Sequence, residues 1–131
     1  MSEYAKVDFP RFTLHLHLFR HGETPPNAER RYPAPFEDAH LSERGEQQAK
    51  ALRSRLSQIK ARFGELDHVF CSPSTRAIQT AQSAGYPHFT IAPALAEAHF
   101  GVMAGRTWAE LEAQYSQAQH TQTHPTHTQD G

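Results

Sequence analysis

Residues 12–24 read Phe-Thr-Leu-His-Leu-His-Leu-Phe-Arg-His-Gly-Glu-Thr, an alternating run that leads into a polar turn. Its leucines fall on one face of an extended chain and its histidines on the other (Leu14, Leu16, Leu18; His15, His17). Alternation of period two predicts a β-strand over residues 12–20. Ligands of open α/β sheets bind beyond the carboxyl ends of strands, so we expect a site at Arg20 and His21.

The next element is a long amphipathic helix. A proline-rich loop over residues 22–41 precedes it, and Ser42 is a suitable N-cap. Apolar residues then recur at spacings of three and four, which is one stripe of a helix (Ala49, Leu52, Leu56, Ile59, Phe63). Gly64 is expected to end this helix.

Two shorter strands are predicted over residues 66–71 and 89–91, on either side of a helix over 74–84. Residues 107–110, Thr-Trp-Ala-Glu, form a capping box for a last helix. Strands that alternate with helices predict an α/β fold with a mostly parallel sheet covered by helices.

The composition of the 131 residues favours one domain. The net charge of −1 disfavours nucleic-acid binding. A single cysteine excludes an intrachain disulfide, and no apolar run is long enough for a membrane span. The first residues lack the apolar region of a signal peptide, so we expect a cytoplasmic protein. We expect neither nucleic acid nor a membrane among its partners.

The apolar pattern stops near residue 115. Residues 116–131 hold four Thr, four Gln and three His, and we interpret them as a polar, low-complexity tail. The domain is therefore predicted over residues 12–115.

A second strand end also carries polar side chains. Residues 71–80 read Cys-Ser-Pro-Ser-Thr-Arg-Ala-Ile-Gln-Thr, which places Arg76 in the first turn of its helix. A helix N-terminus favours an anion through its free N–H groups and its dipole. Two guanidinium groups, Arg20 and Arg76, beside the imidazole of His21 would suit a phosphate dianion that the imidazole attacks.

These residues resemble the histidine phosphatase superfamily, which is phosphoglycerate mutase-like. The resemblance rests on four blocks in order: Arg-His-Gly-Glu-Thr at 20–24 with Asn27, Leu-Ser-Glu-Arg-Gly at 41–45, Cys-Ser-Pro at 71–73 with Arg76, and Leu-Ala-Glu at 95–97. It implies a three-layer sandwich with a mostly parallel sheet, of which residues 12–115 would be an incomplete domain that lacks the last strands.

The resemblance also implies roles for individual residues. His21 would be the nucleophile that forms a phosphohistidine, and Arg20 and Arg76 would bind the phosphoryl oxygens. Glu97 would protonate the leaving oxygen and then activate water. Two polar residues of the first block would contact phosphate or substrate, or would serve only as turn residues (Thr24, Asn27). No metal or cofactor is expected.

The expected reaction is hydrolysis of a small phosphomonoester. Residues 100–108 are similar to those of small-molecule phosphatases, including the α-ribazole phosphatase type, and Ala98 stands where mutases carry a basic residue. Phosphoglycerate mutase-type phosphotransfer is one alternative. A non-catalytic remnant that binds phosphoesters or a partner is another.

One departure from the family pattern limits the expected activity. The family has a second active-site histidine near its C-terminus, and the late histidines here lie in the polar tail (His120, His124, His127). We therefore expect a C-terminally truncated chain that is weak or inactive, and marginally stable or prone to association. A metal site built from His15 and His17, or from the tail histidines, is the remaining alternative.

Overall fold

Helix α2 (Glu43–Phe63) is the longest element of the computed structural model, which describes residue 11 and residues 13–122. The hydroxyl of Ser42 accepts a hydrogen bond from the N–H of Gly45 at 3.1 Å and so caps the helix. Gly64 ends it with a φ of 82°, a conformation that glycine adopts without strain. Both predicted ends of this helix are confirmed.

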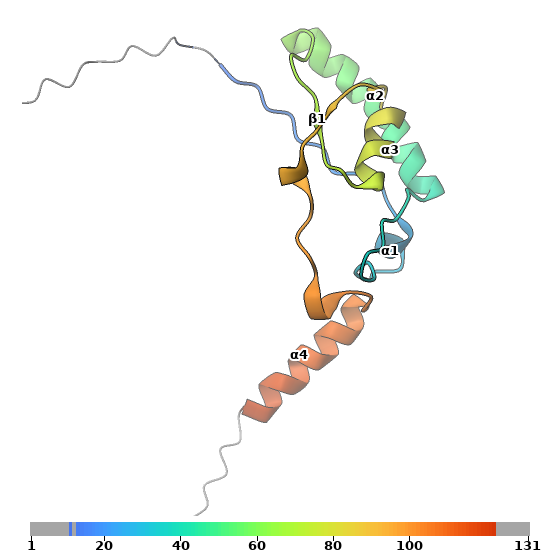
Figure 1. Ribbon diagram of the computed structural model, residues 1–131, viewed down its shortest axis with the longest axis vertical. Helices are drawn as coiled ribbons and strands as arrows, with labels where there is room; N and C mark the ends of the chain where they lie inside the picture. The colour runs from blue at the N-terminus through green and yellow to red at the C-terminus, as the bar shows by residue number, and fades with distance from the viewer. Residues whose placement is uncertain (1–10, 12, 123–131) are drawn as a thin grey trace, which may run out of the picture.

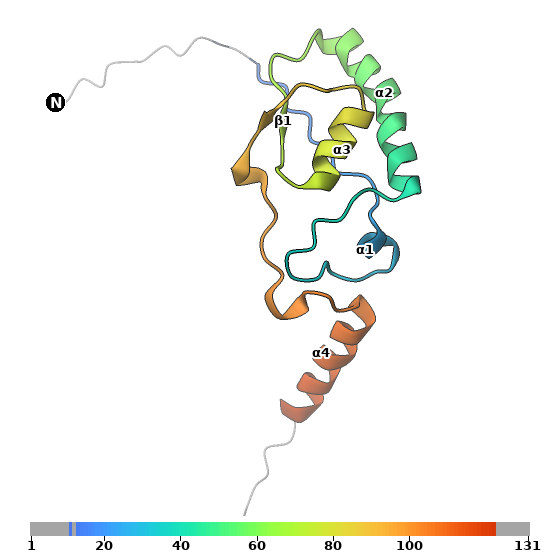
Figure 2. The same ribbon diagram turned by 45° about the vertical axis from the view of Figure 1, so that its right-hand side comes forward.

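The apolar stripe of α2 faces helix α3 (Thr75–Ser83). Leu56 and Ile59 are buried with Ala84, which follows α3, and three partly buried residues surround them (Leu52, Leu66, Tyr86). Figures 1 and 2 show the two helices side by side. The packing of these apolar side chains holds the C-terminal half of α2 against the end of α3.

The sheet of the described residues is a parallel pair. Strand β1 (Phe70–Cys71) pairs with β2 (Thr90–Ile91), and Phe70 lies opposite Thr90. Helix α3 connects the two strands, which is the β-α-β order expected from the sequence. The predicted α/β fold with a parallel sheet is confirmed, although each strand is shorter than predicted.

The predicted strand over residues 12–20 is not confirmed. Its described residues, 13–20, are extended but belong to no hydrogen-bonded ladder. The two faces nevertheless separate as predicted. The rings of His15 and His17 lie 4.4 and 5.2 Å from that of Phe63, whereas the leucines are exposed by 77, 72 and 82% (Leu14, Leu16, Leu18). A strand needs a neighbour for its backbone hydrogen bonds, and alternation alone does not supply one.

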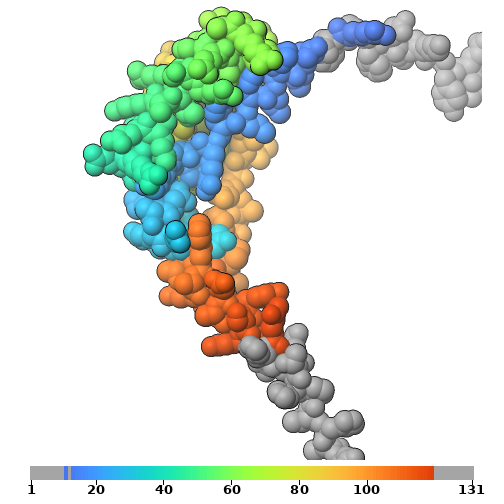
Figure 3. Space-filling view, turned by 180° about the vertical axis from the view of Figure 1, so that it is seen from behind, coloured from blue at the N-terminus to red at the C-terminus, as the bar shows by residue number. Residues whose placement is uncertain are grey.

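The segment 13–20 lies open on one side of the molecule, where Figure 3 shows it in blue. The faces of this segment are therefore covered unequally. Phe63 of helix α2 contacts the rings of His15 and His17 on one face, and the described residues leave the leucine face uncovered.

The remaining elements are short, except the last. Helix α1 (Pro25–Ala28) interrupts the proline-rich loop, and the turns η1 (Pro93–Leu95) and η2 (Gly101–Met103) lead to helix α4 (Trp108–Gln122). Helix α4 extends away from the other helices in both views (Figures 1 and 2). In the described part of the chain, no helix has the length and apolar character needed to cross a membrane.

Helix α4 begins as predicted and continues into the predicted tail. The N–H of Glu110 donates to the hydroxyl of Thr107 at 3.1 Å, and the N–H of Thr107 donates to the carboxylate of Glu110 at 2.8 Å. The helix runs past residue 115 to Gln122 because alanine and glutamine are good helix formers. Its side chains over 112–119 are exposed, so the polar pattern there indicated exposure and not the loss of helix. Residues 123–131, with His124 and His127, lie outside the described residues.

Replacing an exposed leucine with a cation should reduce self-association. We expect Leu16→Lys to lower the association constant several-fold, because a charge on the uncovered leucine face opposes its burial against another chain. Sedimentation velocity over a range of protein concentrations measures this constant. Val102→Lys is the matched control, since Val102 is 86% exposed outside this face. Equal effects of the two substitutions would contradict the prediction.

Candidate active site

The turn that carries His21 is fixed by a close approach of two glycines. A Cβ on Gly22 would lie 2.5 Å from the carbonyl oxygen of Gly45, and a Cβ on Gly45 would overlap the backbone of Glu23. The N–H of Gly22 donates to the hydroxyl of Thr80 at 3.0 Å, and this hydroxyl donates to the carbonyl of Arg76 at 2.7 Å. The turn is thus attached to α2 on one side and to α3 on the other.

Glu23 adds hydrogen bonds between the same turn and the start of α2. Its N–H donates to the side chain of Gln48 at 2.9 Å, and its carbonyl accepts from the N–H of Ser42 at 2.8 Å. The hydroxyl of Ser42 also donates to the carboxylate of Glu23 at 2.9 Å. These contacts explain why the blocks at 20–24 and 41–45 occur together in this chain.

The imidazole of His21 has a defined tautomer. Its Nδ1 lies 2.6 Å from the carbonyl oxygen of Gly22, and a carbonyl can only accept, so Nδ1 carries the hydrogen. Nε2 of the neutral ring then has a free electron pair. Partial burial lowers the pKa of His21 below 6.5, and the positive charges of Arg76 and Arg20 lower it further, against the opposing effects of the Gly22 carbonyl and Glu97. The ring is therefore held in the form that acts as a nucleophile.

Arg76 and Glu97 form the second part of the site. Arg76 lies in the first turn of α3, and its Nη2 is 2.6 Å from a carboxylate oxygen of Glu97. The side chain of Arg76 is 13% exposed and that of Glu97 is 53% exposed. The structure brings four of the predicted site residues into electrostatic reach of one another (Arg20, His21, Arg76, Glu97).

A carboxylate that the sequence analysis did not single out binds the N-terminus of α3. Asp38 accepts hydrogen bonds from both the N–H and the hydroxyl of Thr75, and these bonds lower its pKa. One N–H group that we expected to be free for a ligand is therefore occupied by the protein itself. No local pattern around Asp38 indicates this, because its partner lies 37 positions away.

The two other predicted site residues bond to each other. The N–H and the hydroxyl of Thr24 both donate to Oδ1 of Asn27, at 3.1 and 2.9 Å, and so form the first turn of α1. Thr24 is only 2% exposed. This geometry gives both residues a structural part in the turn, which was one of the two alternatives for them. The proline after Thr24 is the sequence feature that could have predicted this helix, since proline is common at the first helical position.

An open groove of about 530 Å³ adjoins Arg76 and Glu97. Its walls are the loop 33–38, the residues 72–74 before α3, and the segment 96–101. His21 is not among its lining residues. The groove therefore adjoins the Arg76–Glu97 pair, and the imidazole of His21 lies outside its lining.

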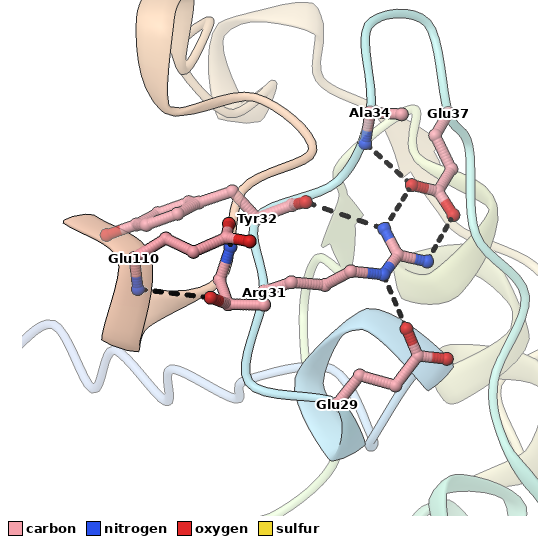
Figure 4. A network of polar contacts seen from close by, with 7 residues as sticks. Glu29, Arg31, Tyr32, Ala34, Glu37 and Glu110 are labelled. Carbon is pink, nitrogen blue, oxygen red and sulfur yellow. Dashed lines mark hydrogen bonds and ion pairs between the residues drawn. The ribbon is translucent and has the colours of Figure 1, made fainter.

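Arg31 holds one wall of this groove, as Figure 4 shows. Its guanidinium contacts Glu37 at 2.9 and 3.1 Å and Glu29 at 2.5 Å, and Glu37 also accepts from the N–H of Ala34 at 2.7 Å. The bidentate pair with Arg31 and the Ala34 bond lower the pKa of Glu37 to about 2. The loop 33–38 is thus closed by charge-assisted hydrogen bonds within itself and to Arg31.

The backbone joins this wall to the segment before α4. The N–H of Tyr32 donates to the carbonyl of Arg106 at 2.9 Å, and the N–H of Trp108 donates to the carbonyl of Arg30 at 2.9 Å. The rings of Tyr32 and Phe100 lie 4.8 Å apart. These contacts hold both long walls of the groove together.

Among the described residues, no three His, Cys, Asp or Glu side chains come close enough together to hold a metal ion. The positive charges near His21 are those of Arg20 and Arg76.

Comparison with known proteins places this site in a family. The model of the histidine phosphatase superfamily (branch 1) matches residues 16–131. The chain belongs to this superfamily. No curated protein matches the chain.

Several solved structures are similar to this histidine phosphatase chain. The phosphoserine phosphatase of Entamoeba histolytica is 30% identical with a TM-score of 0.59, over 70% of this chain and 44% of its own. The protein TTHB049 from Thermus thermophilus is 34% identical with a TM-score of 0.59, over 78 and 54%. A mycobacterial glucosyl-3-phosphoglycerate phosphatase is 28% identical with a TM-score of 0.62, over 77 and 49%. The chain spans about half the length of these structures.

Adding a methyl group at Gly45 should destabilise the fold. We expect Gly45→Ala to lower the free energy of unfolding by roughly 1–3 kcal/mol, because the new Cβ would meet backbone atoms of Glu23 that cannot rotate away. Lys50→Ala, an exposed change on the same helix, should alter it by less than about 0.5 kcal/mol. Urea unfolding followed by circular dichroism measures both. A cost for Gly45→Ala no greater than for Lys50→Ala would refute the contact.

The His21 ring should titrate below pH 6.5 in the folded chain. Between this lowered pKa and 6.5 the unfolded chain binds more protons, so the contribution of His21 makes stability fall as the pH drops below 6.5. A proton NMR titration, assigned with His21→Ala, gives the midpoint. Arg76→Gln should raise the midpoint, whereas Arg55→Gln, exposed on α2, should not. A midpoint at or above 6.5 would contradict the prediction.

Proposed function

We propose that this chain carries the nucleophile of a phosphomonoesterase that works through a phosphohistidine. The observation that carries the proposal is the hydrogen bond from Nδ1 of His21 to the Gly22 carbonyl, which leaves Nε2 as the attacking atom. The lowered pKa of His21 supports it, because only the neutral ring can attack phosphorus. Membership of the superfamily and the likeness to two phosphatases support the same class of reaction.

The proposed reaction has two steps. Nε2 of His21 forms a bond to phosphorus while the bond to the ester oxygen breaks, and Glu97 gives that oxygen a proton. Water then attacks the phosphohistidine, gives a proton to Glu97, and releases inorganic phosphate from Nε2. Arg76 and Arg20 stabilise the phosphoryl charge in both steps.

The ion pair between Arg76 and Glu97 implies an order of events at the site. A phosphate that binds Arg76 displaces the carboxylate 2.6 Å away, and Glu97 is exposed enough to take up a proton from solvent and turn toward the ester oxygen as the carboxylic acid. The guanidinium thus exchanges one anion for another, which limits the cost of desolvating either partner.

The resemblance implies a second histidine, which this sequence does not place at a strand end. We propose slow turnover for this reason, because loss of one preorganised donor costs about 10²–10³ in rate. We propose the first step, formation of the phosphohistidine, as the activity to measure. A small phosphorylated metabolite is the proposed natural substrate class.

Phosphohistidine formation is the decisive test. The chain should acquire an acid-labile phosphoryl group from an aryl phosphate, and His21→Ala should abolish it. His68→Ala is the control, since His68 is exposed and stacks on Phe70, away from the site. Arg76→Ala should slow formation by about 10²–10³-fold, and Glu97→Gln should slow hydrolysis of the intermediate by about 10²–10⁴-fold. Labelling that survives in His21→Ala would refute the assignment.

A further inference from the structure

The groove beside Glu97 is where the alcohol part of a bound phosphoester has to lie. Arg76 and Glu97 line the groove and His21 does not, so the phosphoryl group lies between the imidazole and Arg76. In-line attack by Nε2 places the leaving oxygen on the far side of phosphorus, toward the proton donor Glu97. The leaving group then extends between the loop 33–38 and the segment 96–101.

The walls of the groove are mostly apolar. They comprise three prolines, three alanines and two phenylalanines (Pro33, Pro35, Pro73; Ala34, Ala96, Ala98; Phe36, Phe100). Phe36 is fully exposed, and its φ of 63° lies in the left-handed region that a residue of this size rarely adopts. An exposed aromatic ring held in this way at the rim is available to contact a ligand. The groove, at about 530 Å³, has the usual size of a small-molecule site.

The charged residues of the groove are acidic, apart from Arg76. Glu37, Asp38 and Glu97 line it, and Arg76 is its one Arg or Lys among the described residues; His99 is the remaining titratable group. Arg31 stands behind Glu37, but its guanidinium is already bound by Glu37 and Glu29. Once Arg76 has bound the phosphoryl group, the described lining offers no further guanidinium or ammonium to a second anion.

We propose that the site selects phosphomonoesters whose alcohol part is aromatic or otherwise apolar and carries no second anionic group. This inference rests on the proposed function and names its substrate class. A carboxylate or a second phosphate on the leaving group would lie beside Glu37 and Asp38, and repulsion between like charges at close range opposes binding. An apolar ring gains from contact with Phe36 and the prolines.

Matched pairs of esters test the two halves of the proposal. For charge, phenyl phosphate is compared with 4-carboxyphenyl phosphate, whose extra carboxylate does not make the phenolate a poorer leaving group. For apolar contact, benzyl phosphate is compared with methyl phosphate. The second-order rate constant of phosphohistidine formation should be at least tenfold higher for phenyl than for 4-carboxyphenyl phosphate, and for benzyl than for methyl phosphate.

Substitutions of groove residues test whether the groove causes these two preferences. Ala98→Lys should remove most of the discrimination against 4-carboxyphenyl phosphate, whereas Ala51→Lys, an exposed residue on α2, should leave it unchanged. Phe36→Ala should lower the rate constant for benzyl phosphate and leave that for methyl phosphate unchanged. Val102→Ala should change neither rate constant. Equal rates within each ester pair, or control variants that match the groove variants, would overturn the proposal.

A binding measurement distinguishes a failure of this inference from a failure of the proposed function. Phenylphosphonate and 4-carboxyphenylphosphonate cannot transfer a phosphoryl group, and their dissociation constants are measured by NMR titration. If none of the esters phosphorylates His21, the proposed reaction is refuted. At least tenfold tighter binding of phenylphosphonate would still support the selectivity of the groove, and equal binding would refute it.

Discussion

The backbone contact between Gly22 and Gly45 leaves no room for a Cβ on either residue. Because this contact joins the turn of His21 to the start of α2, it holds the backbone of that turn to the helix. Thr80 fixes the other side of the turn to α3. The apolar packing of α2 on α3, through Leu56 and Ala84, therefore sets where His21 lies relative to the first turn of α3. The candidate site thus depends on hydrophobic burial away from it.

Carboxylates of the chain bind two of the groups that would attract an anion at the site. Asp38 occupies the first N–H of α3, and Glu97 pairs with Arg76. In the proposed reaction a phosphate replaces Glu97 at Arg76, whereas Asp38 is tied to the helix by two hydrogen bonds. The exchange that we propose therefore involves Glu97, and Asp38, which binds both the N–H and the hydroxyl of Thr75, belongs to the scaffold. The same acidic lining is the basis of the selectivity that we propose for the leaving group.

Much of the fold could be predicted because its signals are local. Ser42 and Gly64 mark the ends of α2 through caps, and the apolar stripe between them identifies the buried face. The alternation in 13–20 separated its two faces correctly, but it could not reveal that the segment has no ladder, since a ladder depends on distant strands. Helix α4 continues to Gln122 beyond the point where the apolar pattern stops, because apolar periodicity reports burial, whereas helix propagation depends on backbone propensity.

The sequence by itself determined which reactive groups the site has to work with: the imidazole of His21, the guanidinium groups of Arg20 and Arg76, and a carboxylate at residue 97, in the order of one family. Only the tertiary structure decided which ring nitrogen of His21 carries the hydrogen and that Asp38 closes the start of α3. It alone also decided that an acidic, apolar groove adjoins Glu97. The reason is physical: residue types fix which groups can react, but tautomers and electrostatic fields depend on contacts between residues far apart in the chain.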